Sequence, residues 1–537
     1  MEQVREAWRV AVGSVCGGGM EGMEGGEEGE LWARETGWRR VAKLSAQGLA
    51  LNAAAPVALL VQAAVVGRES GALLAGYAAV TSAVSLVGVV FNFLSDGITA
   101  KVSEAVGRRQ WRRVAQLTRW SLSAALGLGL ACSAVLFALE GAVFLSVLVP
   151  AEVEGAARQF YAVKALSMPV VLLQMASSGV LSGYQHLGLA SGINVARGLL
   201  DILGTVAVVS IGGSLVDLGV SSLIASGAAL VVGLLALEKR APVGAPETFR
   251  AGFRARSRLR RGLEESLLAE GAIEGLEGGT GLGRAGERRA AGSPGSGGGA
   301  GRGRGREPEE EGFWDFVGDG LNMVLRTLLL TSSFYAAAAF ASRVPEPDAA
   351  VRGRGSALAA HGIVVQLWIL QSYITDGIAS VGTMVGGKLY GAGTPTSKQY
   401  FRILTRRLLL LGLAFGLGSV LFLTLFRGPI ISIFTREGDA SYGAILAFLD
   451  QVWPVLVAMQ PINCFVFVYD GLIYALQRFT YIRNVMVSGF FLVFFPILAY
   501  GTYRTHSLLA IWLAKSALNV WRLMGLAGEI HVRVLHN

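Results

Sequence analysis

Two aspartates of this sequence lie within segments that are otherwise apolar. Asp376 stands in the segment 370–393 and Asp96 in the segment 91–107, and each is followed by Gly and Ile. An ionisable side chain in hydrocarbon costs at least about 2.5–3.5 kcal/mol on insertion scales, so it is a functional candidate by default. A carboxylate in such a place can bind a proton or a cation, or it can pair with an arginine. Asp96 and Asp376 are therefore candidates for ion or solute binding.

A third aspartate, Asp201, shares a predicted helix with a basic and an amide side chain. Arg197 precedes it by four residues and Asn194 by seven, a spacing that places all three on one helix face. A fixed guanidinium beside Asp201 would compete with a bound cation. We consider two interpretations: a static ion pair that holds the helices together, and a site that binds and releases a coupling ion.

The second half of the chain has further polar groups in apolar helices. Arg326 and Asp376 lie on neighbouring predicted helices and can pair, either as a structural ion pair or as part of a coupling or substrate site. Asp96 either reaches Arg197 or lies in water near the cytosolic end of its helix, and Asp470 is expected to be solvated near that end. Three neutral side chains either hydrogen-bond between helices or line a cavity: Gln366, Gln460 and Asn463.

No arrangement of residues predicts an enzyme. The five histidines are scattered, and the three cysteines have no metal-ligand or redox spacing. The sequence contains no Gly-rich phosphate loop ending in Gly-Lys-Ser/Thr, which argues against an ATP-driven pump within this chain. We therefore expect no catalytic residues, no metal site and no bound cofactor.

The composition indicates the class of protein. Of 537 residues, 53% are hydrophobic and only 16% are charged, and the mean hydropathy is +0.51. Apolar runs of roughly 20 residues recur, the length that crosses about 30 Å of hydrocarbon as a helix. We therefore predict an all-α polytopic membrane protein with about twelve transmembrane helices. The expected spans lie near 44–66, 72–94, 117–139, 161–181, 187–209, 215–237, 316–341, 358–385, 407–426, 444–468, 484–503 and 508–527.

A stretch rich in Gly, Arg, Glu and Ser at 238–315 separates the first half of the spans from the second. Such a segment cannot bury enough apolar surface to fold, so we expect a disordered cytosolic linker. Its basic part is either simply solvated or in contact with anionic lipid head groups. Lys and Arg concentrate in the loops of one side, which predicts that both termini are cytosolic. The predicted domains are a tail at 1–43, a first six-helix lobe at 44–237, the linker, a second six-helix lobe at 316–527 and a tail at 528–537.

The two predicted lobes repeat one another. Asp96 and Asp376 share an Asp-Gly-Ile setting, and each is followed by a small-residue helix that ends in Gly near basic residues. The interval from the aspartate to that Gly is four residues longer in the second lobe, which is about one helical turn. Pro169 parallels Pro454, and both can bend their helices. Transporters are commonly built from such repeats, with the binding site near mid-membrane between them.

Several short runs of the second lobe occur in the order found in a known family. They are Leu325-Arg326-Thr327, Ala360-His361-Gly362-Ile363 with Gln366-Leu367-Trp368, Asp376-Gly377, Gly391-Ala392-Gly393, Gln460-Pro461-Ile462-Asn463, Asp470-Gly471-Leu472, and Ile511-Trp512 with Arg522. Taken together, these runs resemble the multidrug and toxic compound extrusion (MATE) transporters. The resemblance is to the branch of DNA-damage-inducible-F-type bacterial proteins and plant organic-anion MATEs. The first lobe matches more loosely.

The resemblance implies about twelve helices in two bundles around a central cavity. It also implies export of organic solutes by alternating access in exchange for H⁺ or Na⁺, and a coupling role for the aspartate at the position of Asp201. Two residues depart from the family pattern. Arg197 stands where an asparagine is usual, and Gln62 stands where a second family aspartate lies.

We therefore predict a secondary-active antiporter that exports organic solutes or xenobiotics, with H⁺ or Na⁺ as the coupling ion. The expected partners are the lipid bilayer and a small organic substrate, which Arg197 and Arg326 suggest is a carboxylate. We expect a monomer and no nucleic-acid partner, in the plasma membrane or in an organelle membrane such as that of the plastid or vacuole. The alternatives are a lipid-linked flippase of the same superfamily and a non-transporting membrane scaffold organised by the linker.

Overall fold

Helices make up all the regular secondary structure that the computed structural model describes, so the predicted all-α fold is confirmed. The described residues are 26–69, 93–146, 151–250, 312–345, 355–435 and 442–535, with scattered positions between 73 and 91. Residues 1–245 and 318–537 form one compact unit that contains both helical lobes. Residues 246–317 form a second unit, and most of the predicted linker lies outside the described residues.

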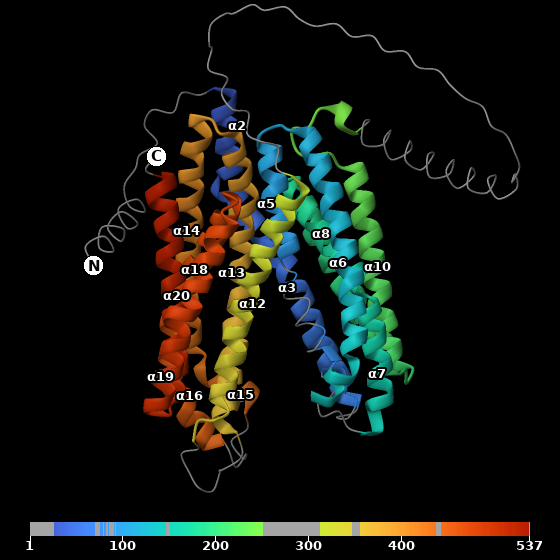
Figure 1. Ribbon diagram of the computed structural model, residues 1–537, viewed down its shortest axis with the longest axis vertical. Coiled ribbons are helices and arrows are strands. Elements are labelled where there is room, and N and C mark those ends of the chain that lie inside the picture. Colours follow the sequence, from blue (N-terminus) through green and yellow to red (C-terminus); the bar gives the residue numbers. More distant parts are fainter. Residues whose placement is uncertain are drawn as a thin grey trace, which may run out of the picture. The chain divides into compact units, whose positions relative to one another are not determined.

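Each half of the chain contributes a set of long helices to this unit (Figure 1). The half before the linker forms α2 (Glu27–Thr36), α3 (Trp38–Glu69), α5 (Phe93–Gly107), α6 (Trp111–Ser146), α7 (Ala151–Leu166), α8 (Met168–Gly183), α9 (Leu187–Ser210) and α10 (Leu215–Lys239). The half after it forms α12 (Phe313–Ala341), α13 (Ser356–Ala392), α14 (Pro395–Leu425), α15 (Arg427–Phe434), α16 (Tyr442–Ala458), α17 (Gln460–Ala475), α18 (Phe479–Ser488), the π-helical turn η2 (Gly489–Phe494), α19 (Phe495–Thr505), α20 (Leu508–Gly528) and the π-helical turn η3 (Glu529–Leu535).

Eight of the described helices are long and apolar enough to cross a membrane, and two bent helix pairs raise this number to ten. Much of the predicted span at 72–94 lies outside the described residues. The predicted span at 508–527 is α20, which has four polar or charged side chains on its buried face. They are Lys515, Ser516, Asn519 and Arg522, and they lower the mean hydropathy of α20, so this helix is not one of the eight.

Both bent pairs break at a proline, and the two breaks correspond to one another. α7 and α8 meet at 42° and α16 and α17 meet at 47°. Pro169 opens α8 and Pro461 opens α17, where the missing N–H of proline interrupts the helix ladder. Pro454 lies inside α16, so its predicted correspondence to Pro169 is wrong and Pro461 takes that place.

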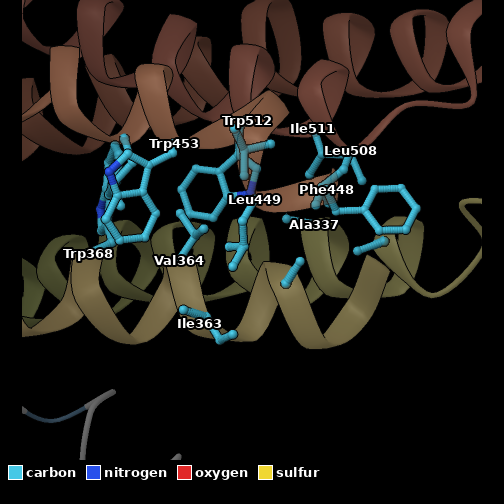
Figure 2. Close-up of a cluster of buried hydrophobic side chains, with 14 of the residues drawn as sticks. Ala337, Ile363, Val364, Trp368, Phe448, Leu449, Trp453, Leu508, Ile511 and Trp512 are labelled. Atoms are coloured by element: carbon cyan, nitrogen blue, oxygen red, sulfur yellow. The ribbon is translucent and has the colours of Figure 1, made fainter. Parts of the chain in front are cut away.

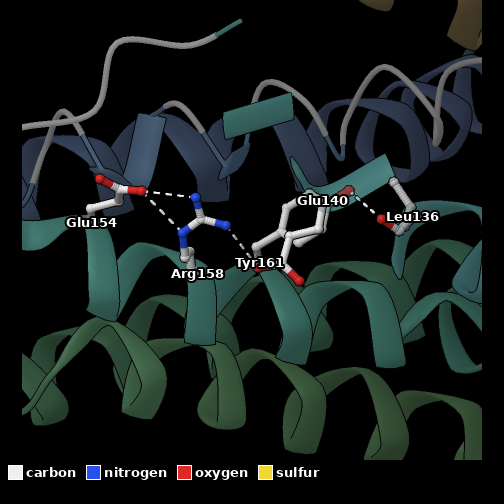
Figure 3. Close-up of polar contacts among 5 residues, drawn as sticks. All are labelled: Leu136, Glu140, Glu154, Arg158 and Tyr161. Carbon is white, nitrogen blue, oxygen red and sulfur yellow. Dashed lines mark hydrogen bonds and ion pairs between the residues drawn. The ribbon is translucent and has the colours of Figure 1, made fainter. Parts of the chain in front are cut away.

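The outer half of the first bent pair is tied to α6 by polar contacts (Figure 3). Arg158 of α7 donates to Glu154 at 2.8 Å and to Glu140 of α6 at 3.3 Å. The Tyr161 hydroxyl donates to the Leu136 carbonyl at 2.9 Å. Arg158 therefore lies on a helix that is joined to α6 through Glu140. These contacts fix α7 in place next to the break.

The interior of the second lobe is an apolar cluster with three large indoles (Figure 2). Trp368 of α13 and Trp512 of α20 have ring centroids 5.5 Å apart, and Trp453 of α16 packs in the same cluster. Leu449 and Phe448 fill the space between these helices. The Trp453 ring nitrogen donates to the Leu423 carbonyl at 3.2 Å. This cluster joins α13, α16 and α20.

The lobes meet where α13 packs against α3 and α5. A Cβ added to Gly107 of α5 would collide with the Lys388 carbonyl of α13, and a Cβ added to Gly391 of α13 would collide with the Glu104 carbonyl of α5. A glycine of each helix thus packs against a main-chain carbonyl of the other helix. Glycine permits this close approach because it has no Cβ. A Cβ on Gly48 of α3 would lie 2.5 Å from a main-chain oxygen of α13. Glycines therefore set the distance between the lobes.

A second repeated contact defines the register of the two halves. Thr99 of α5 donates to the Gly179 carbonyl at 3.0 Å, and Thr383 of α13 donates to the Gly471 carbonyl at 3.2 Å. Asp96 lies three residues before its threonine, whereas Asp376 lies seven before its own. The Asp-Gly-Ile sequence of the second lobe is therefore displaced by one helical turn from that of the first lobe. The two aspartates do not occupy equivalent positions.

The short helix α2 crosses from the first half of the chain to the second. α3 begins at Trp38, so the described part of the predicted tail at 1–43 is largely helical. Glu35 of α2 pairs with Lys388 of α13 at 3.4 Å, and Lys388 lies over the buried Trp32 ring. Arg407 of α14 donates to the Thr36 carbonyl at 2.5 Å. α2 therefore binds the second lobe while its chain continues directly into the first.

Gly391→Ala should weaken the contact between the lobes. The new Cβ would collide with the Glu104 carbonyl, and overpacking of this kind typically costs about 1–3 kcal/mol. The matched control is Gly418→Ala on α14, where a Cβ meets nothing within 4 Å. Thermal unfolding of the purified protein should show a lower midpoint for Gly391→Ala than for Gly418→Ala. Equal midpoints would contradict the close approach of α5 and α13.

Candidate functional site

Asp201 of α9 is buried in the first lobe with only one of its two carboxylate oxygens partnered. Its Oδ2 accepts from the Ser222 hydroxyl of α10 at 3.4 Å. Its Oδ1 is buried and has no hydrogen-bond partner among the described residues. Lys164 of α7 donates to the same Ser222 hydroxyl at 2.7 Å. A cation therefore stands one hydroxyl away from the carboxylate, and the free oxygen leaves a place for a proton or an ion.

Gln62 of α3 holds the main chain at Asp201. Its side-chain nitrogen donates to the Thr205 hydroxyl at 2.9 Å and to the Asp201 carbonyl at 3.4 Å. Its side-chain oxygen accepts from the Tyr77 hydroxyl at 3.0 Å. The uncharged amide of Gln62 thus connects Tyr77 and Thr205 next to the carboxylate of Asp201. All of these side chains are buried.

The predicted pairing of Arg197 with Asp201 is wrong for the described residues. No ion pair joins them, and the Arg197 Nε is buried without a hydrogen-bond partner. The Asp201 carboxylate instead faces α10 through Ser222. Asn194 also faces elsewhere, because it accepts from Gln174 of α8 at 2.7 Å and donates to Ser178 at 3.0 Å. Spacing on one helix placed the three side chains on one face, and Arg197 and Asp201 interact electrostatically without forming a direct ion pair among the described residues.

Asp470 of α17 is the centre of a second buried network. Its Oδ2 accepts from Arg326 of α12 at 2.5 Å and from Arg522 of α20 at 2.6 Å. Arg326 also lies over the Tyr474 ring, with its guanidinium carbon 5.6 Å from the centroid. Asp470 is 3% exposed, so the expectation of a solvated carboxylate is wrong. The predicted Arg326–Asp376 pair is wrong as well, because Arg326 binds Asp470.

Asp376 and Asp96 are half-buried near the contact between the lobes. Asp376 accepts from Asn52 of α3 at 3.0 Å, a hydrogen bond between the two lobes. Asp96 makes neither a hydrogen bond nor an ion pair within the described residues, so it does not reach Arg197. The two carboxylates interact electrostatically with one another and with Arg326. Two acidic groups, one from each lobe, and the Arg326 guanidinium therefore share one electrostatic environment.

The three neutral candidates have different surroundings. Gln460 is fully buried at the break between α16 and α17 and donates back to the Leu456 carbonyl at 2.8 Å. Asn463 accepts from Asn519 of α20 at 2.6 Å, which connects it to Arg522. Gln366 is exposed on the surface of α13. Only Gln460 and Asn463 thus belong to the interior of the second lobe.

Sequence reasoning missed the residues that complete these sites. Lys164 lies within the predicted span at 161–181 but was not among the candidate residues. Ser222 and Thr205 carry no signal in a sequence, because hydroxyls are common in membrane helices. Arg522 appeared only as part of a family run, with no partner. Lys515 of α20 was not noticed, although a lysine inside an apolar run is the same signal that drew attention to Asp376.

Comparison with known proteins agrees with this architecture of two repeated helical lobes in a multi-pass membrane protein. The MatE family model matches residues 52–207 and 323–500, which is more than half of the chain. The chain belongs to the MatE family, the multidrug and toxic compound extrusion proteins. The prediction of this family is thereby confirmed.

Curated relatives are found among plant proteins. Protein DETOXIFICATION 43 of Arabidopsis thaliana is 28% identical over 204 residues, which are 38% of this chain and 35% of that protein. Protein DETOXIFICATION 44, chloroplastic, of the same plant is 29% identical over 179 residues, which are 33% of this chain and 32% of that protein. The chain thus spans about a third of the length of these two relatives.

Solved structures match over nearly the whole chain. A MOP superfamily transporter from Pyrococcus furiosus has a TM-score of 0.72 at 15% identity, covering 96% of this chain and 100% of that chain. An outward-facing multidrug resistance MATE family transporter has a TM-score of 0.71 at 14% identity, with the same coverage. At this level of identity the likeness concerns the fold.

Asp470→Asn should destabilise the second lobe strongly. The substitution leaves two buried guanidiniums without a counter-charge, and breaking a buried pair by removing one partner costs about 3–5 kcal/mol. Asp376→Asn is the matched control, because Asp376 is half-buried and an amide oxygen can still accept from Asn52. Thermal unfolding of both purified variants measures the difference. A larger loss for Asp376→Asn would contradict the assignment of Asp470 as the structural centre.

Proposed function

We propose that this protein is a secondary-active antiporter that exports organic solutes in exchange for an inward-moving cation, H⁺ or Na⁺. The observation that carries the proposal is the Asp201 carboxylate, which is buried inside a family-typical lobe with one oxygen unpartnered. A buried carboxylate without an ion pair binds a proton or a cation more readily than one that is fully compensated. This supports the coupling role over that of a static pair.

The groups around Asp201 can make cation binding reversible. Ser222 links the carboxylate to the Lys164 ammonium, so the charge of Asp201 is partly balanced when no coupling ion is present. Binding of a proton or a cation cancels the negative charge of Asp201 and so removes its attraction for the Lys164 ammonium. Since Lys164 lies on α7 and Asp201 on α9, ion binding would change the attraction between two helices of the first lobe. Gln62 would transmit the change to α3.

The contact between the lobes supports a conformation closed on one side. The α5–α13 contact, the α2 contact and the Lys101–Asp319 ion pair at 2.7 Å lie on the side whose loops carry most of the Lys and Arg. With both termini in the cytosol, as the positive-inside rule predicts, this side is cytosolic. The protein would then be open outward here, and a solute would enter from the cytosol only after these contacts separate.

The charges near the contact between the lobes bear on the class of solute. The expectation of a carboxylate substrate rested on Arg197 and Arg326, and the charge of Arg326 is compensated by Asp470. Asp96 and Asp376 place two acidic groups in the same region. Arg197 remains the support for an organic anion, while the two aspartates favour an organic cation. Because two relatives are named chloroplastic, a plastid membrane is the location to test first.

Asp201→Asn should abolish gradient-driven transport, because an amide cannot release and bind a proton. The assay reconstitutes the full chain into liposomes, imposes a H⁺ or a Na⁺ gradient, and follows uptake of ethidium as a cationic dye and of benzoate as a carboxylate. The matched control is Asp450→Asn, an exposed aspartate of α16. Full activity of Asp201→Asn would refute the site. Absence of gradient-driven uptake by the wild type with both probes would count against antiport of these classes.

A further inference from the structure

Lys515 of α20 is buried inside the second lobe, and it takes no part in the sites described above. Its side chain is 2% exposed. Its Nζ donates to the Ser333 hydroxyl of α12 at 2.6 Å, and that hydroxyl donates to the Leu330 carbonyl at 2.6 Å. The Nζ also lies 3.2 Å from the centroid of the Phe334 ring. One hydroxyl and one aromatic face are thus its polar contacts.

No carboxylate compensates Lys515 within the described residues. Two ionisable groups interact electrostatically with Lys515, and both are bases. Arg522 lies further along α20, where Asp470 of α17 already compensates it, and His361 lies on α13. The surrounding faces of α16 and α19 contribute apolar side chains such as Val452 and Leu498. An ammonium that is buried without a counter-charge is strongly unfavourable, so this packing favours the neutral amine, which can accept a proton.

His361 is a second buried base without a nearby counter-charge among the described residues. It is 3% exposed, and neither ring nitrogen has a hydrogen-bond partner among the described residues. Its ring lies against Trp512 of α20, with centroids 5.4 Å apart, and Trp512 precedes Lys515 by about one helical turn (Figure 2 shows Trp512 in the core). The indole nitrogen of Trp512 is unpartnered too. Two buried nitrogen bases therefore share a core in which Lys515 has one hydroxyl partner and His361 has no hydrogen-bond partner among the described residues.

We propose that Lys515 and His361 form a proton-binding pair in the second lobe, separate from Asp201 and selective for H⁺ over Na⁺. Each base has a nitrogen lone pair that accepts a proton, whereas Na⁺ requires several oxygen ligands. Among the described residues, the Ser333 hydroxyl is the one oxygen that hydrogen-bonds to the amine. Like charges in an apolar core repel, so the pair holds one proton at a time. Binding converts an amine to an ammonium or an imidazole to an imidazolium, and release returns that proton to water.

The pair rests on the proposed antiport function and refines it by naming the coupling ion. A proton entering this core places an uncompensated charge between α12, α13 and α20. The charged form is less costly where the amine can reach water or a carboxylate, so protonation would favour a different packing of α20. The second lobe would then respond to protons independently of the first.

A direct test uses the fluorescence of Trp512 in the purified full-length protein. A protonated base beside an indole quenches its emission, and the Trp512→Phe variant gives the signal of the other tryptophans. The difference signal should titrate across about pH 5–9, the range in which histidines and perturbed amines change charge. It should be unaffected by Na⁺ at constant pH. A difference signal independent of pH, or one that responds to Na⁺, would overturn the proposal.

The Lys515→Met variant tests the amine itself. Methionine fills a similar volume without a charge, so the thermal midpoint should stay the same or rise, whereas a purely structural lysine would lower it. The pH response of the Trp512 signal and H⁺-driven uptake in liposomes should both be reduced or lost. Lys398→Met, at an exposed lysine of α14, is the matched control. If Lys515→Met does not fold, Lys515→Arg keeps the charge but cannot release a proton, so it should abolish the same responses.

The outcomes separate this proposal from the general function. Wild-type transport that persists unchanged in Lys515→Met, with an unaltered pH profile, would overturn the proton pair and leave antiport through Asp201 standing. A wild type without gradient-driven uptake would count against antiport, and the fluorescence titration would still decide whether Lys515 and His361 bind a proton.

Discussion

A charge buried among apolar helices must be compensated, and the degree of compensation distinguishes the polar groups of this molecule. Asp470 has two guanidinium partners and joins three helices of the second lobe. Asp201 has a single hydroxyl contact on one oxygen and none on the other. Lys515 has a hydroxyl and a ring face. Since uncompensated charge costs several kcal/mol in such surroundings, the groups with the poorest compensation are those whose charge changes most readily.

The two lobes share a scaffold but not a chemistry. The repeated contacts of Thr99 and Thr383 and the repeated breaks at Pro169 and Pro461 show the same backbone plan in both halves. The first lobe encloses a carboxylate next to a lysine, and the second encloses two bases next to indoles. The same backbone plan therefore encloses different polar side chains in the two lobes, while the contacts that pack the helices are repeated.

Much of the fold could be predicted from the sequence, because the bilayer requires long apolar helices and proline and glycine mark their breaks and contacts. The partners of the charged residues could not. Spacing along α9 places Arg197 and Asp201 on one face, but it does not say which neighbouring helix each one meets. The partner of Arg326 lies 144 residues away in the chain, so only the packing could reveal Asp470 in place of Asp376. The sequence showed that the interval from aspartate to glycine is four residues longer in the second lobe. The contacts of Thr99 and Thr383 were needed to show that this difference displaces the aspartate by one helical turn.

The reciprocal approach of α5 and α13 has an evolutionary consequence. Gly107 rests on the Lys388 carbonyl and Gly391 on the Glu104 carbonyl, so each half supplies both sides of the same contact. This is the geometry of an isologous interface, in which one surface patch is complementary to itself. A half-length ancestor could have formed this contact as a homodimer around a two-fold axis. The present chain corresponds to such a dimer with its subunits joined end to end, which freed the two copies to specialise.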